Sequence, residues 1–203
     1  MEIKVGIVHA AREIVLESEE SAAAIEDRFA KAVADELRAS GFESMLPSGN
    51  DPLYSDAVAA LARAFATHGI DLVYGGGRVG LMGAVADAVL DTGGRVTGVM
   101  PRALVDGEIA HNGLTRLEVV ADMHERKLRM AELGEAFVAL PGGAGTLEEF
   151  FEIWTWQQLG LHAKPVALYD VIGFWQPLLT TIDQLVDDGF LASQYRDSLV
   201  IAR

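Results

Sequence analysis

The sequence predicts a doubly wound α/β fold, in which helices cover both faces of a mostly parallel sheet. Short apolar segments alternate along the chain with longer segments whose apolar residues recur at helical spacing. Two glycine turns, at residues 75–83 and 141–146, each follow an apolar segment and open a helical one. Because the carboxyl ends of parallel strands share one edge of a sheet, both turns are expected at the edge where such folds bind ligands.

The expected elements follow in order from the amino terminus. Strands are expected where short apolar runs are bounded by glycine, proline or polar residues, at 3–8, 70–74, 96–100, 117–120, 136–140 and 166–169. Helices are expected where apolar residues recur every three or four positions, at 22–37, 55–68, 83–90, 123–133, 146–159 and 174–186. A looser stretch is expected between Pro101 and Asn112. Repeated alternation of strand and helix implies right-handed crossovers between parallel strands.

Two parts are distinguished along the chain. Residues 43–203 form the predicted α/β domain. Residues 1–42 are either an altered first strand and helix of that domain or a separate extension, because the turn-rich residues 47–52 follow them.

Composition narrows the class of protein. A chain of 203 residues with 50% apolar composition suits one folded domain with a sizeable core. It has no apolar run long enough to span a membrane and no secretory signal, so a cytoplasmic location is expected. The absence of cysteine excludes disulfides, thiolate metal sites and a thiol nucleophile.

The charge of the chain bears on its partners. A formal net charge of −14 argues against non-specific nucleic-acid binding, whose affinity comes from Lys and Arg side chains that neutralise phosphates. An anionic substrate would need local cations, and four lie beside the glycine turns: Arg78, Arg102, Arg126 and Lys127.

The turn at 141–146 has the pattern of a phosphate-binding site. Glycine permits positive φ and a close approach of the backbone to a ligand. The first N–H groups of the helix that follows are unpaired, and together with the helix dipole they attract an anion. The candidate groups are the backbone of Gly142, Gly143 and Gly145 and the hydroxyl of Thr146, which hold a phosphate without a metal.

Several motifs together resemble the LONELY GUY family of cytokinin riboside 5′-monophosphate phosphoribohydrolases. The resemblance covers the chain from residue 46 onward and rests on residues 72–83, 123–127, 141–149, 154–160 and 164–166, in the family's order and spacing. It implies a Rossmann-like fold and a homodimer with active sites near the subunit interface. It further implies cofactor-free hydrolysis of the N-glycosidic bond of a nucleoside 5′-monophosphate, with a free base and ribose 5-phosphate as products. Relatives often carry the label lysine decarboxylase, but nothing in the sequence indicates a pyridoxal phosphate site.

Glu149 is the candidate catalytic carboxylate. Cleavage of a glycosidic bond builds positive charge on the sugar, and a carboxylate beside the anomeric carbon can stabilise that charge or activate water. The alternative is a capping box over residues 146–149, in which Glu149 folds back onto the backbone. The resemblance favours catalysis, because the second Glu of the family's motif falls on Glu149.

Arg126 is the second candidate catalytic residue. From the residues alone, its stem could cover apolar surface, or its charge could pair in solvent with Glu125 or Glu132. The resemblance places Arg126 on the family's catalytic Arg, which would bind the ribose or phosphate and polarise the leaving base. Lys127 would assist in substrate binding.

The remaining candidates are less well defined. Gly76 and Gly77 either contact the substrate or only permit a tight turn. Glu108 falls where relatives keep an acidic substrate-contacting residue, and the alternative is an exposed loop residue without a role in binding. Ser48 and Gly49 stand in place of the family's phosphate-contacting Gly-Ser-Ser loop.

No metal site is expected, because His111 and His124 lack a second His or Asp at ligand spacing. Two other functions stay open. Molybdenum-cofactor carrier proteins share the fold and a similar glycine turn, and a carrier would bind its ligand without cleaving it. A nucleotide-sensing dimer would likewise leave the nucleotide intact.

Overall fold

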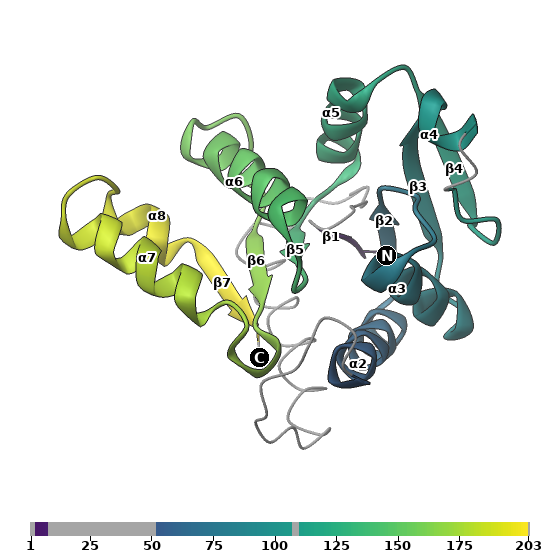
Figure 1. The fold of residues 1–203 in the computed structure, drawn as a ribbon, viewed down its shortest axis with the longest axis horizontal. Coiled ribbons are helices and arrows are strands. Elements are labelled where there is room, and N and C mark those ends of the chain that lie inside the picture. The colour runs from purple at the N-terminus through teal and green to yellow at the C-terminus, as the bar shows by residue number, and fades with distance from the viewer. Residues whose placement is uncertain (1–2, 8–51, 107–109, 203) are drawn as a thin grey trace.

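The computed structural model describes residues 3–7, 52–106 and 110–202, which form an α/β fold built on one parallel sheet (Figure 1). The strands are β1 (Ile3–Ile7), β2 (Ile70–Tyr74), β3 (Val96–Pro101), β4 (Arg116–Val120), β5 (Phe137–Ala139), β6 (Val166–Tyr169) and β7 (Leu199–Ala202). The helices are α2 (Pro52–His68), α3 (Gly80–Asp91), α4 (Arg102–Asp106), α5 (Met123–Leu133), α6 (Ala144–Gln158), α7 (Gln176–Asp187) and α8 (Ser193–Asp197), with a 3-10 turn η1 at Val171–Gly173.

Helices cover both faces of the sheet. In Figure 1, α2 and α3 lie on one side of the strands, and α5, α6 and α7 lie on the other. The second layer is held by large buried side chains on β5 to β7 and on the helices over them, among them Phe150, Trp154, Trp175 and Ile182. Removal of this apolar surface from water supplies the main stabilisation of the layer. The predicted fold class is therefore confirmed.

The order of the strands, β4-β3-β2-β1-β5-β6-β7, places β1 in the middle of the sheet. It pairs in parallel with β2 on one side and with β5 on the other, so that Gly6 lies opposite both Val73 and Phe137. The chain builds outward from β1 to β4 and then crosses back to β5. Ligands of open α/β sheets bind at this point of reversal, outside the carboxyl ends of the strands. Both glycine turns, which follow β2 and β5, lie beside it.

Most elements agree with the predicted ones to within a few residues. The predicted helix at 22–37 lies outside the described residues. Two short helices, α4 and α8, were not predicted, because five residues are too few to show a helical period. β7 was not predicted either, although its apolar residues pair with β6 as the last strand of the described sheet. Among the described residues, no helix is both long and apolar enough to cross a membrane.

Candidate active site

Helix α6 begins directly in the glycine turn that follows β5. Its N-cap is Gly143, with φ −91°, which has no side chain to cap the helix. Thr146 is thus the third residue of the helix rather than its cap, and Glu149 lies in the second turn. The capping-box alternative for residues 146–149 is wrong, because the helix begins two residues earlier than predicted. The carboxylate of Glu149 is therefore not used to close the helix end.

The glycines of this turn provide open space rather than unusual backbone angles. None of Gly142, Gly143 and Gly145 has positive φ, contrary to the expectation from sequence. A Cβ atom added at Gly143 or Gly145 would meet no atom within 4 Å. Thr146 is buried. The first N–H groups of α6 point out of the helix end, as at any helix start, and Gly143 and Gly145 carry no side chains there.

The turn after β2 uses its glycines differently. Gly76 has φ 78° and Gly80 has φ 62°, a region that favours glycine. Gly77 forms an isolated antiparallel bridge with Ala110. A Cβ atom at Gly83 would lie 2.2 Å from the carbonyl oxygen of Arg78, so α3 can pack onto the turn only with glycine there. Turn geometry thus accounts for Gly76 without a ligand.

Helix α5 is fixed at its start by a capping interaction. The Asp122 side chain accepts hydrogen bonds from the backbone N–H groups of His124 and Glu125, at 2.8 and 2.9 Å. The Glu125 carboxylate accepts from the N–H of Ala121 at 2.6 Å. These hydrogen bonds, that from Glu125 first, hold the pKa of Asp122 below its usual value. The next turn of the helix carries Arg126.

Arg126 and Glu149, which are 23 residues apart in the chain, meet between α5 and α6. Nη1 of Arg126 donates to Oε1 of Glu149 at 3.2 Å, and the two side chains are 10% and 13% exposed. The alternative pairing of Arg126 with Glu125 or Glu132 is wrong, because Glu125 binds backbone and Glu132 pairs with Arg129. Arg126 is among the few buried charged residues of the described chain.

Both members of this pair keep hydrogen-bonding capacity. Nε of Arg126 and Oε2 of Glu149 are buried, and neither has a hydrogen-bond partner within the described residues. Burial, the largest cause, raises the pKa of Glu149, while the charge of Arg126 opposes the shift. A buried carboxylate with a raised pKa, one free oxygen and a fixed guanidinium beside it is the arrangement expected of a catalytic acid or base.

Lys127 is held by carboxylates of α6. Its ammonium group forms ion pairs with Glu148 and, at 3.2 Å, with Glu152. The side chain of Lys127 is 15% exposed. Lys127 therefore ties α5 to α6 beside the Arg126–Glu149 pair.

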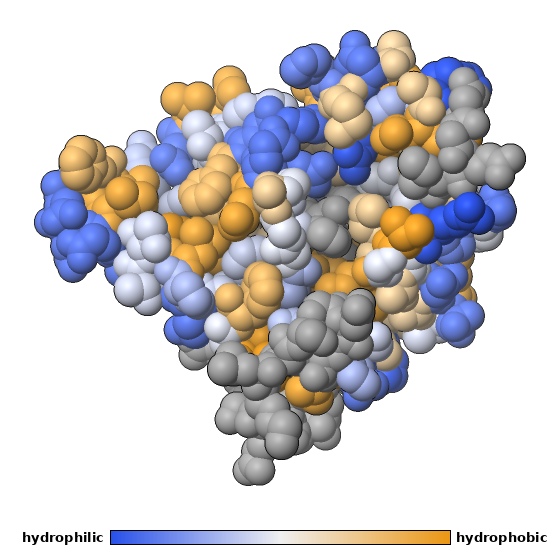
Figure 2. Space-filling model, viewed as in Figure 1, coloured by the Kyte–Doolittle hydropathy of each residue, from blue (hydrophilic) through white to orange (hydrophobic). Residues whose placement is uncertain are grey.

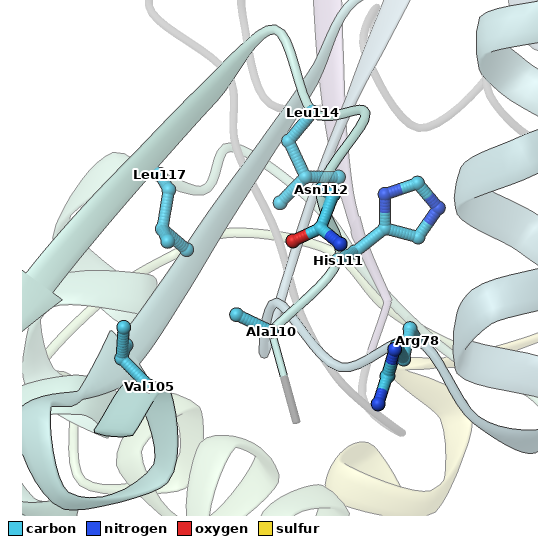
Figure 3. A pocket seen from close by; sticks show the side chains of 7 residues that line it. All are labelled: Arg78, Val105, Ala110, His111, Asn112, Leu114 and Leu117. Atoms are coloured by element: carbon cyan, nitrogen blue, oxygen red, sulfur yellow. The ribbon is translucent and has the colours of Figure 1, made fainter. Parts of the chain in front are cut away.

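A hollow of about 610 Å³ lies on the other side of the turn after β2 (Figure 3). Its lining is Arg78, Val105, Ala110, His111, Asn112, Leu114 and Leu117. Gly76 faces Leu117, whereas the neighbouring Gly75 faces Arg126, so the hollow and the Arg126–Glu149 pair flank the turn. His111 is fixed by Asp87, whose carboxylate lies 2.9 Å from Nε2.

Some predicted residues cannot be placed. Ser48, Gly49 and Glu108 lie outside the described residues. Within the described ranges, no group of three or more His, Asp and Glu side chains is arranged to hold a metal ion.

Four contributors to the site were missed. Asp122 and Glu125 carry a recognisable capping pattern, and Glu152 lies one helical turn after Glu148. Gly75 carries no separate signal in the sequence, because it is the first of three consecutive glycines.

Comparison with known proteins gives two family matches and several close relatives. A family described as possible lysine decarboxylase matches residues 82–203, and a family of proteins of unknown function (DUF3107) matches residues 1–40. The cytokinin riboside 5′-monophosphate phosphoribohydrolase LOG5 of Arabidopsis thaliana is 50% identical over 155 residues, which cover 76% of this chain and 68% of the relative. The enzyme of that name from Rhodococcoides fascians is 48% identical over 156 residues, covering 76% and 79%.

Solved structures share the fold. The X-ray structure of TM1055, a structural-genomics target, matches with a TM-score of 0.55 and 26% identity, covering 79% of this chain and 86% of that one. The molybdenum cofactor carrier protein of Chlamydomonas reinhardtii matches with a TM-score of 0.54 and 22% identity, covering 77% and 84%. At that identity the likeness to the carrier shows the fold alone.

A third sequence relative supports the family. LOGL3 of rice, named a probable enzyme of the same kind, is 50% identical over 154 residues, which cover 76% of this chain and 73% of the relative. With matches this extensive, the chain belongs to the LONELY GUY family of cytokinin riboside 5′-monophosphate phosphoribohydrolases.

Proposed function

We propose that this protein hydrolyses the N-glycosidic bond of N6-modified adenosine 5′-monophosphates and releases the free base and ribose 5-phosphate. The observation that carries the proposal is the buried contact between Arg126 and Glu149 beside the open start of α6. Relatives that are about half identical to this chain bear the name of this activity.

Glu149 acts on the sugar. As the bond to the base breaks, positive charge develops at the anomeric carbon, and an ionised carboxylate next to it stabilises that charge or removes a proton from the attacking water. Oε1 of Glu149 is held by Arg126, and Oε2 is the oxygen with free capacity. We therefore assign the contact with the ribose or the attacking water to Oε2 of Glu149.

Arg126 acts on the leaving base and on the anionic part of the substrate. Its guanidinium is fixed by burial and by Glu149, and its Nε has no hydrogen-bond partner in the described part of the chain. A fixed donor costs little reorganisation when negative charge develops on the base or when an anion binds. Arg126 would accordingly bind the ribose or phosphate and polarise the leaving base.

The start of α6 receives the 5′-phosphate. What supports this assignment is the open space at Gly143 and Gly145 and the position of the turn at a helix start, where the dipole favours an anion. The proposed phosphate contacts are Gly142, Gly143, Gly145 and Thr146. We also propose substrate contacts from six further residues: Ser48, Gly49, Gly76, Gly77, Glu108 and Lys127.

The active protein is proposed to be a homodimer. Exposed apolar side chains on and just after α5 and α6 support this, because large apolar residues that gather on a surface mark contact sites. They are Leu128, Phe151, Leu159 and Leu161. Figure 2 shows apolar residues on one face of the molecule, over the part that carries α6. An interface there would lie next to the helices that carry Arg126 and Glu149.

The test is a chromatographic assay of purified protein with AMP and with N6-isopentenyl-AMP. We expect the wild type to release free base, and Glu149→Gln and Arg126→Ala each to lower kcat by about 10²- to 10⁴-fold, the usual contribution of a positioned acid or base. Glu148→Gln is the matched control, because Glu148 is the adjacent carboxylate but is exposed. It should keep most of the activity.

Two outcomes would contradict the proposal. Full activity of Glu149→Gln would show that the carboxylate of Glu149 is not catalytic. Tight binding of both nucleotides by the wild type without release of base would instead favour a carrier or a sensor.

A further inference from the structure

Gly75 lies directly against the guanidinium group of Arg126. A Cβ atom added at Gly75 would lie 1.9 Å from Nη2, 2.8 Å from Cζ and 3.2 Å from Nε of Arg126. Distances below 3.0 Å cannot be accommodated without movement. The guanidinium therefore occupies the volume that any side chain at position 75 would need.

Space, and not backbone conformation, explains glycine at this position. Gly76, the next residue, has φ 78° and would be strained with a side chain, but Gly75 has no positive φ. Other residues could adopt the backbone angles of Gly75. The feature that excludes them is the position of Arg126.

We propose that Gly75 is a positioning residue, which sets how deeply the Arg126 guanidinium lies and so brings it into contact with Glu149. This inference rests on the proposed function, in which Arg126 and Glu149 are the catalytic pair. Gly75 itself needs no contact with the substrate.

The surroundings determine which group moves when Gly75 is replaced. The backbone at the end of β2 is held, because β2 pairs with β1 and with β3 and Tyr74 is fully buried. Arg126 is the end of a flexible side chain. A methyl group at position 75 would therefore displace the guanidinium and lengthen its 3.2 Å contact with Glu149.

A double-mutant cycle tests the proposal with four proteins: the wild type, Gly75→Ala, Arg126→Ala and the double variant. We expect Gly75→Ala alone to lower kcat roughly 10²-fold, the effect of a misplacement of about 1 Å. In the protein that already carries Arg126→Ala, the further substitution Gly75→Ala should alter kcat less than about twofold, because the guanidinium that it would displace is absent. The acid limb of the rate profile of Gly75→Ala should also move to higher pH, because Arg126 lowers the pKa of Glu149.

The thermal midpoint Tm gives a second readout that does not depend on activity. Gly75→Ala should lower Tm in the protein that keeps Arg126 and should have little effect on Tm beside Arg126→Ala, where the methyl group has room. This comparison decides the proposal even if the wild type proves unable to cleave nucleotides, or if Gly75→Ala alone is too unstable to assay.

Gly94→Ala is the matched control. Its added Cβ would lie 2.7 Å from Cγ1 of Val89, between α3 and β3 and away from Arg126, and Gly94 also lacks positive φ. It should lower Tm equally with and without Arg126, and the folded protein should keep its kcat. The proposal is overturned if Gly75→Ala behaves in the same additive way.

Discussion

At the scale of single residues, the environment of Glu149 sets the conditions under which it can act. Burial raises its pKa most, the charge of Arg126 lowers it, and the charge of Glu148 raises it. If Glu149 must be ionised for the reaction, the enzyme loses activity as the pH falls. Because the pKa of Glu149 is raised, this loss begins at a higher pH than it would with an exposed carboxylate. The charges around Glu149 should therefore be visible in the pH dependence of the rate.

Glu148→Gln should move the acid limb of the profile of kcat/KM against pH to lower pH. Removal of a negative charge near Glu149 lowers the pKa of Glu149, so that the ionised form persists in more acid solution. The shift should be small, because Glu148 is 57% exposed and solvent screens its charge. Glu132→Gln, a change at a similarly exposed glutamate of α5, should leave the limb in place. A shift to higher pH would show that the limb does not report Glu149.

Part of the site follows from sequence at this scale, and part does not. Arg126 and Glu149 were singled out through motifs, but their contact depends on two helices that pack side by side, which spacing along one chain does not reveal. The ion pairs of Lys127 with α6 depend on the same packing. The role of Gly75 depends on where Arg126 lies in three dimensions. Local patterns predict which groups are present, and tertiary packing decides which of them meet.

At the scale of elements, α5 and α6 start in different ways that suit their roles. Asp122 closes the start of α5 with its side chain, which fixes the helix that positions Arg126. Helix α6 instead has Gly143 as its N-cap, a residue without a side chain that could close the helix start. The alternative interpretation from sequence put a cap at the start of α6, where Thr146 and Glu149 have the spacing of a capping box. A similar spacing occurs at Asp122 and Glu125, where Asp122 caps α5 and Glu125 accepts from the N–H of Ala121.

Asp122→Ala should lower both Tm and kcat, because the first turn of α5 loses the acceptor for two N–H groups and Arg126 follows in the next turn. Asp122→Asn should keep most of both, since its side-chain oxygen accepts the same hydrogen bonds. The lowered pKa of Asp122 means that the carboxylate stabilises the fold at neutral pH and that this contribution is lost as the pH falls through the lowered pKa.

Any difference in Tm between the wild type and Asp122→Asn should therefore shrink in acid solution. Calorimetry at several pH values measures it. Equal Tm values for Asp122→Ala and the wild type at neutral pH would contradict the role of the cap.

At the scale of the whole molecule, the order of the strands brings the two glycine turns together. Alternation of strands and helices was sufficient to predict a parallel sheet, because few other arrangements bury such a pattern. It was not sufficient to predict the order of the strands, which depends on where the chain crosses back. The first 42 residues left two interpretations open, and the structure places the strand at Ile3–Ile7 in the middle of the sheet.

Light scattering should give a mass near twice the 21.8 kDa of the chain if the proposed homodimer forms. Leu128→Glu combined with Leu159→Glu should shift the mass toward that of the single chain, since both side chains are apolar and more than half exposed. Phe190→Glu, at a still more exposed apolar residue between α7 and α8, is the control and should leave the mass unchanged. A wild type that stays at 21.8 kDa at micromolar concentration would contradict the dimer.

The central position of β1 also has a consequence for synthesis. The segment Ile3–Ile7 leaves the ribosome before the other described strands, and its neighbours begin only at Ile70 and Phe137. Until the second of them emerges, one edge of β1 lacks its native partner, and open strand edges invite pairing with other chains. Contacts between residues so distant in sequence also slow folding. Newly made chains of this protein should therefore depend on chaperones until residue 139 has left the ribosome.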